Sequence, residues 1–540
     1  MKSTKLAALA VATAPQALAG YVWPSPHDFL EDLLAMQQGY IRMGFTDLVV
    51  PCGHGGNRPG VNNAAQWIRT GFHDFATHDK AAGTGGLDAS LLYEVDRPEN
   101  EGSAFNDTFA DMSDFLTPRS SAADLIALAV VASVASCGGS KIPLRAGRID
   151  AKAAGPAGVP KPDDSLESTI DAFARTGFNM SDMIALVACG HTVGGVHSVD
   201  FPDITGGEED VLNVPQFDST GTAFDTAVVD EYLDSNGANP LVFGANDTTN
   251  SDKRVFGADG NSTMNRLKDR DTFQATCASL FERMIDTVPS TVTLSEPIEL
   301  VDVKPYIDRL ELSANASALA FEGRVRVRTS ASTGRDNEGI SIALDVVDNA
   351  NTSKLVQAAR ARARGGTSTG FYNEEFTWFE FATELDAKDG IKAFDVQLTT
   401  EKTGAVETFD NAGTGGFPSN DNLLYAQSKS CIDATVKGGN MTVTIGATVR
   451  EDADKAGEAP MIKLAHKVQQ QGVMLPRLAV EGVAMKKSNT SQGGYVFYSV
   501  DIPIEAAGWS TKFDVVLPTT DGEIVSGPHG TNDLSACSDV

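Results

Sequence analysis

The sequence predicts a mainly α-helical domain followed by two all-β modules of the sandwich type. Three observations support this fold class. Between residues 28 and 290, several segments carry apolar residues at every third or fourth position, which is typical of amphipathic helices. After Pro289 the pattern changes to the two-residue alternation of strands, interrupted by Gly, Asn and Asp turns. Two blocks of this second half also recur at a constant offset.

The chain begins with a segment typical of a secretory signal peptide. Lysines precede an apolar run from Leu6 to Ala12, and small residues ending at Ala19 follow. We therefore expect residues 1–19 to be removed and the mature protein to be secreted and extracellular. No later stretch has the roughly 18 unbroken apolar residues of a membrane-spanning helix, so the sequence predicts no membrane span.

Two further sequence features agree with an extracellular protein. The six cysteines are even in number and far apart, which suits disulfides in an oxidising compartment, although spacing alone does not select a pairing. Asn-X-Ser/Thr sites predict a glycoprotein. They lie at Asn106, Asn179, Asn246, Asn261, Asn315, Asn351, Asn440 and Asn489.

The composition excludes some classes of partner. With 72 acidic against 43 basic residues, the net charge of −29 would repel nucleic acid and anionic membranes. The hydrophobic share of 41% is too high for a disordered chain.

Residues 20–290 form the predicted helical domain. Ser121 starts one helix, and Ser181 with Asp182 starts another. The segment from Thr205 to Ser262 is rich in Asp, Gly, Asn and Thr, which predicts long ordered loops. Helices are expected at residues 64–75, 122–136, 165–176, 181–189 and 272–286.

The rest of the chain is divided into two β-sandwich-like modules, at residues 291–430 and 431–540. The block starting at Phe376 resembles the block starting at Tyr495, and the block at Lys392 resembles the one at Thr511; both offsets are 119 residues. A shared offset for two separated blocks indicates a tandem repeat.

Two histidine-containing segments in the helical part carry residue types that are typical of catalytic or metal-binding sites. Arg69 and His73 are four residues apart on one predicted helix, so a permanent cation and a titratable base share one face. His191 follows the end of an apolar helix, where one ring nitrogen could ligate a metal. Each feature by itself also suits an ordinary surface, capping or core residue.

Together these motifs resemble those of the secreted fungal haem peroxidases of the plant-peroxidase superfamily, of the class II type. Arg69-X-X-Phe72-His73-Asp74 is similar to the distal motif, and Gly190-His191-Thr192 to the proximal one. Ala122 to Leu128 and Leu144 to Asp150 are similar to the helix and turn between them. The resemblance covers about residues 28–288 and implies one haem b; the C-terminal β-rich region is additional.

The resemblance implies roles on the distal side of the haem. His73 would take a proton from the near oxygen of hydrogen peroxide and return it to the far one. Arg69 would stabilise the charge on the departing oxygen, and Phe72 would pack over the haem. Asn100 would accept from the His73 ring, and Glu94 would orient Asn100.

On the proximal side, the resemblance makes His191 the axial iron ligand. Its other ring nitrogen would donate to a buried carboxylate, which makes it a stronger electron donor. We expect this carboxylate to be Asp252, with Asp259 as the competitor because the alignment of this loop is loose. Phe217 would lie beside the ring, where a relative uses tryptophan.

Two calcium ions are also implied, with oxygen ligands at the family's spacing. The alternative is Asp-rich turns that bind nothing. Because each site adjoins one histidine, calcium would brace both. The distal set is Asp74, Gly86, Asp88 and Ser90; the proximal set is Thr192, Asp218, Thr220, Ala223 (through its carbonyl) and Asp225.

The resemblance also bears on the cysteines. Cys52 with Cys137 resembles a family disulfide. Cys189 could pair with Cys277, and a bond between Cys431 and Cys537 would close the last β module. The family's usual eight cysteines are not all present, so its full pattern of bonds does not transfer.

Departures from the family affect the expected reductant. Manganese peroxidases bind Mn(II) with carboxylates, but the matching positions here are Val61, Ala65 and His197. The lignin-type surface tryptophan would fall at Leu186. The resemblance therefore implies hydrogen peroxide and small phenols or aromatic amines as substrates. Trp67 and Trp23 could relay electrons, although packing is their expected role.

Two other functions stay open. One is a non-catalytic secreted protein that binds or adheres to polymer, on a degenerate peroxidase scaffold. Its β modules would contact polysaccharide or lignin; Trp378 and Trp509 could form a strip for this, although strand spacing favours a core role. The other is a metal-dependent hydrolase built on His73, Asp74 and His78, for which no third ligand has a recognisable spacing.

Overall fold

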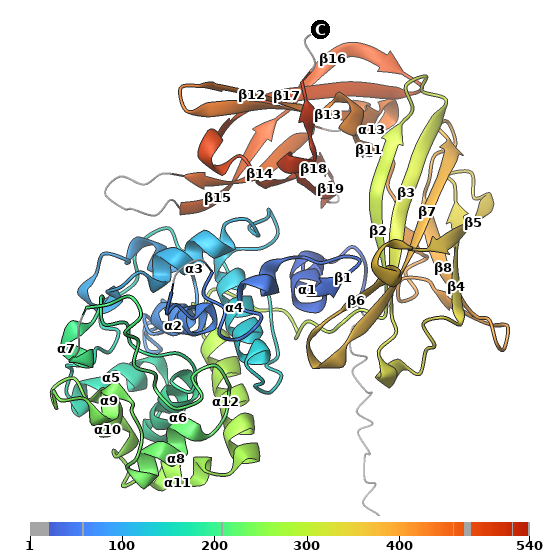
Figure 1. Cartoon of the computed structure of the whole chain (residues 1–540). Coiled ribbons are helices and arrows are strands. Elements are labelled where there is room, and N and C mark those ends of the chain that lie inside the picture. Colours follow the sequence, from blue (N-terminus) through green and yellow to red (C-terminus); the bar gives the residue numbers. More distant parts are fainter. Residues whose placement is uncertain are drawn as a thin grey trace, which may run out of the picture.

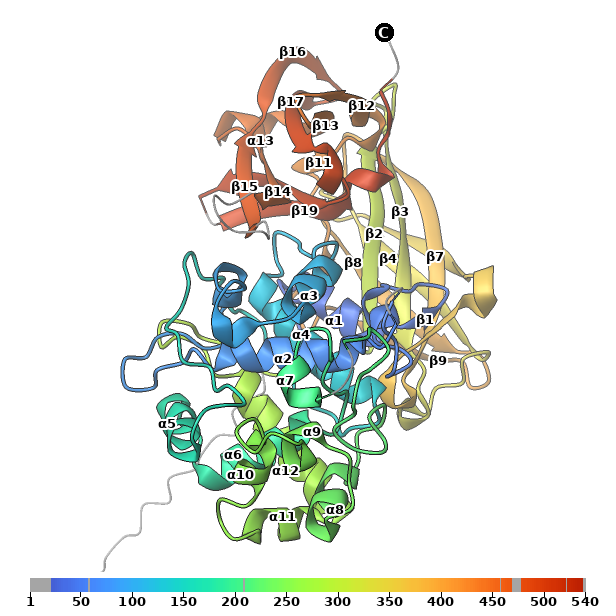
Figure 2. The same ribbon diagram turned by 60° about the vertical axis from the view of Figure 1, so that its left-hand side comes forward.

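The computed structural model describes residues 21–56, 59–206, 209–456, 458–468, 477–520 and 522–537. The predicted signal peptide at residues 1–19 lies outside the described residues. The described chain forms a helical domain, a first β-sandwich module beside it and a second module above it (Figure 1). A turned view shows the same arrangement (Figure 2). The predicted fold class is therefore confirmed.

The helices fall mainly in the first 285 residues. Their bounds are α1 (Asp28–Ala35), α2 (Asn63–Phe75), α3 (Ala104–Met112), α4 (Ala122–Ser136), α5 (Leu166–Thr176), α6 (Met180–Gly190), α7 (Pro202–Thr205), α8 (Ala227–Asp234), α9 (Pro240–Phe243), α10 (Ser251–Phe256), α11 (Ser262–Leu267), α12 (Arg270–Ile285) and α13 (Glu451–Ala456).

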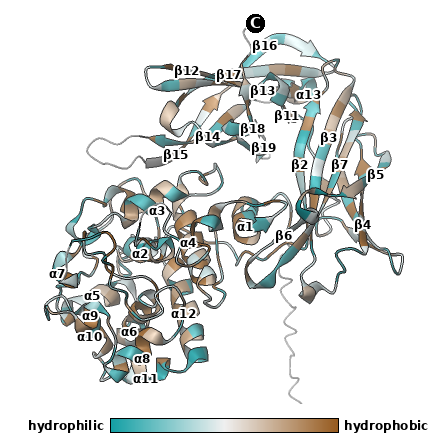
Figure 3. Ribbon diagram, viewed as in Figure 1, coloured by the Kyte–Doolittle hydropathy of each residue, from teal (hydrophilic) through white to brown (hydrophobic). Residues whose placement is uncertain are grey.

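The five predicted helices are confirmed within two residues at each end, as α2, α4, α5, α6 and α12. α4 is hydrophobic along its length (Figure 3) and buried on nearly all sides, because it forms the centre of the helical domain. The Ser121 side chain caps it by accepting from the Asp124 amide at 3.0 Å. At α6 the predicted start is wrong by a residue or two: Asn179 is the N-cap, and Asp182 completes a capping box.

The expectation of loops between Thr205 and Ser262 is wrong in part. This segment contains the short helices α8, α9 and α10. Each has eight residues or fewer, which is too short for a clear periodic pattern in the sequence. Helices of this length are stabilised by tertiary packing, and α10 packs against both α9 and α6.

The strands occupy mainly the second half of the chain. Their bounds are β1 (Gln38–Gly39), β2 (Val303–Leu312), β3 (Ala318–Arg328), β4 (Ile340–Val347), β5 (Ser353–Arg360), β6 (Thr367–Thr369), β7 (Glu375–Asp386), β8 (Ala393–Thr400), β9 (Ala405–Phe409), β10 (Phe417–Pro418), β11 (Leu423–Tyr425), β12 (Cys431–Lys437), β13 (Asn440–Arg450), β14 (Met461–Val468), β15 (Arg477–Ala484), β16 (Lys486–Gln492), β17 (Tyr495–Glu505), β18 (Lys512–Thr519), β19 (Gly522–Gly530) and β20 (Ser535–Ala536).

The two modules share one topology. In the first, β2-β3-β7-β6 and β5-β4-β8-β9 pair in these orders. In the second, β12-β13-β17-β16 and β15-β14-β18-β19 repeat them strand for strand. The repeated sequence blocks are β7 with β17 and β8 with β18. β11 lies before the predicted boundary at residue 431 and pairs with β13 of the second module.

The N-terminal segment joins the helical domain to the first module. Trp23 lies 6.5 Å from Phe394 and 6.1 Å from Phe417, between ring centroids. Asn411 exchanges two hydrogen bonds with the backbone of Trp23, at 2.7 and 2.8 Å. β1 pairs with β6 of the same module. Residues 21–39 therefore contribute to the core and the sheet of a module that begins more than 250 residues later.

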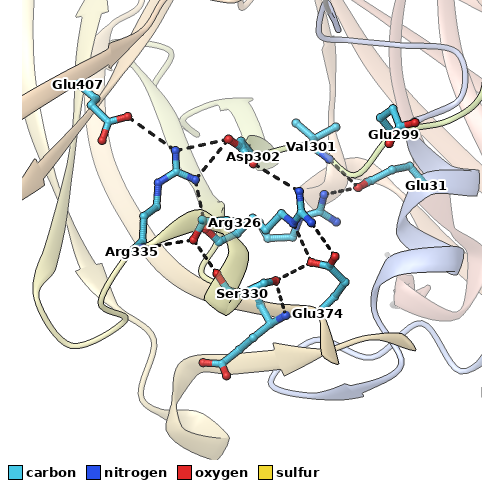
Figure 4. A network of polar contacts seen from close by, with 12 residues as sticks. Glu31, Glu299, Val301, Asp302, Arg326, Ser330, Arg335, Glu374 and Glu407 are labelled. Carbon is cyan, nitrogen blue, oxygen red and sulfur yellow. Dashed lines mark hydrogen bonds and ion pairs between the residues drawn. The ribbon is translucent and has the colours of Figure 1, made fainter. Parts of the chain in front are cut away.

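A buried group of charges connects α1 to this module. Glu31 accepts from the Val301 amide and binds Arg326 of β3 (Figure 4). Lys304 of β2 lies 3.0 Å from Glu31 and 2.8 Å from Asp32. Burial opposes the charge of Lys304, but the two carboxylates raise its pKa. The charges are mutually compensated, as burial requires.

The second module contacts the helical domain directly. Arg119, which precedes α4, binds Asp514 of β18 at 3.1 Å and the Gly527 carbonyl at 2.9 Å. The connecting segment runs along the helical domain, where Ser295 and Ile298 donate backbone hydrogen bonds to Ala146 and Leu144. The modules are thus packed onto the helical domain.

Three disulfides close the helical domain and the second β module. Cys52 bonds to Cys137 and Cys189 to Cys277 in the helical domain, and Cys431 bonds to Cys537 in the second module. All three expected pairs are therefore confirmed. Among the described helices, none combines the length and apolar character needed to cross a membrane.

Candidate active site

A cavity of about 1200 Å³ lies inside the helical domain. Arg69, Phe72 and His73 of α2 line it, as do His191, at the C-terminal end of α6, and Phe217. Every described lining residue lies between Gly53 and Met284, so the described parts of the β modules contribute nothing to its wall. The two histidine motifs, 118 residues apart in the sequence, meet at one cavity.

On the α2 side, a chain of hydrogen bonds determines which ring nitrogen of His73 carries the proton. The Asn100 amide nitrogen donates to the Glu94 carbonyl oxygen at 2.9 Å, which turns the amide oxygen towards His73. This oxygen lies 2.7 Å from His73 Nδ1. Because an amide oxygen only accepts, Nδ1 carries the proton and Nε2 keeps a free lone pair. The predicted link between His73 and Asn100 is present.

The Glu94 contact differs from expectation in one respect. Its backbone carbonyl, and not its carboxylate, binds Asn100. The carboxylate instead accepts from the Gly155 amide at 2.6 Å and pairs with Arg97 at 3.2 Å. A backbone acceptor is held by the fold, so the orientation of Asn100 does not depend on the ionisation of Glu94.

Burial determines the charges on the distal side. Burial and the neighbouring Arg69 cation lower the pKa of His73 to about 3. Burial lowers the pKa of Arg69 to about 10, against the attraction of Asp200 and Glu101. At neutral pH the pair is therefore a neutral base beside a cation, which is the arrangement needed to take a proton and stabilise an anion.

At the C-terminal end of α6, His191 Nδ1 lies 2.8 Å from the Asp252 carboxylate. α10 begins at Ser251 and places Asp252 in its first turn, where it is buried. The Phe217 ring stacks on His191, with centroids 4.2 Å apart and a 10° angle between planes. The competitor Asp259 instead accepts from Thr263 at 2.7 Å. The structure therefore pairs His191 with Asp252.

Sequence reasoning missed one member of this group. Asn239 is buried and donates to the same oxygen of Asp252 at 3.0 Å. The available signal was the Asn239-Pro240 dipeptide, which is typical of a helix start and is the N-cap of α9. One carboxylate oxygen of Asp252 thus accepts from both Asn239 and His191.

These residues fit a haem. His191 uses Nδ1 for Asp252, leaving Nε2 to ligate a metal, and 31% of its side chain is exposed at the cavity. The neutral His73 also lines the cavity. An imidazole ligand, a second imidazole that can act as a base and a cavity wall that includes Phe72, Val187 and Phe281 are together suited to an iron porphyrin.

The expected distal calcium residues lie in one buried loop system next to His73. Asp74 accepts from the backbone amides of Asp88, Ala89 and Leu91 at 2.8–3.0 Å. Burial and the nearby Asp88 raise the pKa of Asp74 well above its usual range. The Ser90 hydroxyl is buried and has no hydrogen-bond partner among the described residues. Two close carboxylates and an unpartnered oxygen suit a divalent cation.

The expected proximal calcium residues are also brought together. Thr192 donates to the Asp225 carbonyl at 2.8 Å and faces Asp218 at 3.5 Å. Thr220 donates to the Asp225 carboxylate at 2.9 Å, and the Ala223 amide binds the Thr220 carbonyl. Burial and the charge of Asp225 raise the pKa of Asp218 to about 7. These oxygens also fit a calcium ion.

Four positions predict the reductant, and the one expected at the surface, Leu186, is buried. Val61, Ala65 and His197 all line the cavity, and none of them offers a carboxylate. Leu186 is buried, so it is no surface relay. Trp67 is buried and donates to Asp111 at 3.3 Å. Trp23 packs into the first β module, so the packing role expected for both tryptophans is confirmed.

The hydrolase alternative finds no support. Within the described ranges, no three His, Cys, Asp or Glu side chains converge on a metal position. His78 Nδ1 lies 3.0 Å from the Gly85 carbonyl. Trp378 is fully buried and donates to Ser368 at 3.0 Å, so the core role expected for it is confirmed. Trp509 is 36% exposed in the turn between β17 and β18, so the core role expected for it is wrong. Because one tryptophan is buried, the two do not form an exposed strip.

Comparison with known proteins agrees with this geometry. Residues 57–268 match the family model described as peroxidase. A "WSC domain-containing protein" of Arthroderma benhamiae is 36% identical over 526 residues, which is 96% of this chain and 68% of that protein. That match spans both the helical domain and the β modules.

Other relatives match a smaller share of the chain. "Peroxidase 44" of Arabidopsis thaliana is 32% identical over 153 residues, which is 26% of this chain and 47% of that protein. "Manganese peroxidase H4" of Phanerodontia chrysosporium is 28% identical over 181 residues, 32% of this chain and 45% of that protein. The chain thus spans less than half the length of both peroxidases.

Proposed function

Because the chain belongs to the plant-peroxidase superfamily, we propose that it is a secreted haem peroxidase that reduces hydrogen peroxide and oxidises small phenols or aromatic amines. One observation carries the proposal: a neutral His73 held by Asn100 and a His191 held by Asp252 line the same cavity. A scaffold that had lost its activity would have no reason to keep both hydrogen-bonded pairs.

Each of the residues around the cavity would have its own role in the reaction. Haem b, when bound, supplies the iron that binds peroxide and passes its oxidising equivalents to the reductant. His73 Nε2 takes the proton from the near peroxide oxygen and delivers it to the far one, so that this oxygen leaves as water. Arg69 stabilises the negative charge that develops as the oxygen–oxygen bond breaks. His191, polarised by Asp252, would hold the haem iron through Nε2 and make it more electron-rich.

The same proposal includes two calcium ions and an aromatic reductant. Calcium would bind next to His73 and next to His191, at the two oxygen clusters described above. Small aromatic reductants are favoured because Val61, Ala65 and His197 offer no carboxylate for Mn(II). Asn-linked glycans and secretion follow from the sequence signals.

The test is the absorption spectrum of the purified full-length protein, loaded with haem and calcium, before and after one equivalent of hydrogen peroxide. We expect a haem Soret band that changes with peroxide and returns on adding a phenol. His73→Ala should keep the haem and react about 10²–10⁴-fold more slowly. His191→Ala should lose ordinary haem binding.

A control is His529→Ala. This histidine lies on β19 of the second module and does not line the cavity. It should react at the normal rate. Two results would contradict the proposal and favour the non-catalytic polymer-binding alternative. One is the absence of a Soret band after haem reconstitution. The other is a wild-type Soret band that does not change when peroxide is added.

A further inference from the structure

One aromatic ring touches both distal side chains. Phe105, near the start of α3, lies with its ring centroid 4.7 Å from that of His73. The guanidinium carbon of Arg69 lies 4.6 Å from the same centroid. Phe105 is 1% exposed and does not line the cavity, so it supports the pair without reaching a bound substrate.

Side-chain hydrogen bonds between α2 and α3 hold Phe105 in this position. Thr70 donates to the Thr108 hydroxyl at 3.0 Å, and Gln66 donates to Asp107 at 3.1 Å. Gln66, Thr70 and His73 lie on one face of α2, and Phe105 and Thr108 lie on one face of α3. These hydrogen bonds fix how far α3 is shifted along α2. They therefore fix the position of the Phe105 ring beside Arg69 and His73.

Arg69 has competing partners at the edge of the cavity. Its guanidinium donates to the Glu101 carbonyl at 2.9 Å, and the carboxylates of Glu101 and Asp200 attract it. Phe201 offers a second ring, 5.6 Å away. A guanidinium is attracted to the face of an aromatic ring. The closer ring, Phe105, therefore favours the position of Arg69 next to His73 over one nearer Asp200.

We propose that Phe105 is a positioning residue for the peroxide reaction. Its ring holds the Arg69 guanidinium and the His73 imidazole in a fixed relation, so that the base and the cation act on the same peroxide molecule. A branched aliphatic side chain fills the volume but offers no face for the cation. This inference rests on the proposed function of the cavity.

The test compares Phe105→Leu, Phe105→Tyr and Phe109→Leu in the full-length, haem-loaded protein. Phe109 is the matched control: it is on the same helix, is 3% exposed and does not line the cavity. One readout is the rate constant for reaction with hydrogen peroxide, followed by haem absorption. The other is the dissociation constant of fluoride, an anion that reports the placement of the distal donors independently of turnover.

We expect Phe105→Leu to slow the peroxide reaction about tenfold or more and to weaken fluoride binding about threefold or more. Phe105→Tyr keeps the ring and should stay within about threefold of the wild type in both readouts. Phe109→Leu should leave both unchanged. If Phe105→Leu does not take up haem, Phe105→Met, which is similar in volume and lacks a ring, replaces it.

The outcomes separate this inference from the proposed function. Equal effects of Phe105→Leu and Phe109→Leu on both readouts would overturn the role of Phe105. A wild-type protein that binds fluoride but ignores peroxide would overturn the proposed function, while the fluoride comparison would still decide whether Phe105 places the distal groups.

Discussion

The two cavity histidines differ in the group that binds Nδ1. His73 donates to a neutral amide oxygen, whereas His191 donates to a buried carboxylate. An amide fixes the tautomer and adds no charge, so burial and the Arg69 cation still lower the pKa of His73, although the hydrogen bond with Asn100 opposes them. A carboxylate pulls the Nδ1 proton towards itself and makes Nε2 more electron-rich, which suits a metal ligand. One residue type thus obtains two chemical characters from its neighbours.

Asp252→Asn tests this difference at a single residue. An amide in place of the carboxylate removes the charge that strengthens His191 as a donor. We expect the reduction potential of the haem iron to rise and the rate of reaction with peroxide to fall about 10–100-fold. Potentiometric titration and stopped-flow absorption measure the two effects.

The matched control for this prediction is Asp259→Asn. Asp259 lies seven residues further on and binds Thr263, so its loss should shift neither the potential nor the rate. If both variants behaved alike, Asp252 would have no special relation to His191.

At the scale of elements, each histidine sits at the junction between a helix and an oxygen-rich loop. Asp74 follows His73 directly in α2, and Thr192 follows His191 at the end of α6. At each junction one carboxylate, Asp74 or Asp218, has its pKa raised by burial and by a neighbouring aspartate. Without a cation these groups oppose folding; with one they would stiffen the chain next to the catalytic residue.

Removing calcium tests the two junctions. We expect a chelator to lower the melting temperature and excess calcium to restore it, since a ligand at 100 times its dissociation constant adds about 2.7 kcal/mol to the free energy of unfolding. Asp218→Asn should reduce the response to calcium. Differential scanning calorimetry with and without chelator provides the measurement.

Asp234→Asn is the control for this experiment. This residue lies on α8 with 61% of its side chain exposed, outside both oxygen clusters. It should leave the calcium response unchanged. If neither chelator nor calcium changed the melting temperature of the wild type, the proposal of two calcium sites would be contradicted.

At the scale of the whole molecule, the β modules are joined to the helical domain by buried contacts. The carboxylates of α1 surround Lys304 and Arg326, and Trp23 fills part of the first module's core. A module cut from the chain at residue 291 would lose these partners and leave two buried cations uncompensated. Tests of polymer binding therefore need the full-length protein.

Lys304→Met tests the buried junction. The substitution leaves Glu31 and Asp32 with one cation fewer in a buried site, so we expect the free energy of unfolding to fall by about 3–5 kcal/mol. Urea unfolding followed by fluorescence measures it. Limited proteolysis of the native variant should cut near residue 300 sooner than in the wild type.

An exposed lysine provides the comparison. Lys253 pairs with Asp247 at 3.0 Å with 56% of its side chain exposed. Lys253→Met should cost less than about 1 kcal/mol. If the two variants lost equal stability, the charges between α1 and the first module would contribute no more than a surface pair.

The sequence by itself determined the features that depend on local pattern. Apolar periodicity predicted α2, α4, α5, α6 and α12, and the 119-residue offset predicted two modules of one topology. Motif spacing identified Arg69, His73 and His191, because residues one turn apart on a helix share a face wherever that helix lies. The even number and wide spacing of the cysteines predicted disulfides, and three are present.

Only the tertiary structure decided which distant residues meet. It selected Asp252 over Asp259, and it showed that Glu94 acts through its carbonyl and that Asn239 supports Asp252. It brought Phe105 against Arg69 and His73, and inserted Trp23 into a module several hundred residues away. Such contacts depend on how helices and sheets pack against one another, and no local pattern in the sequence carries that information.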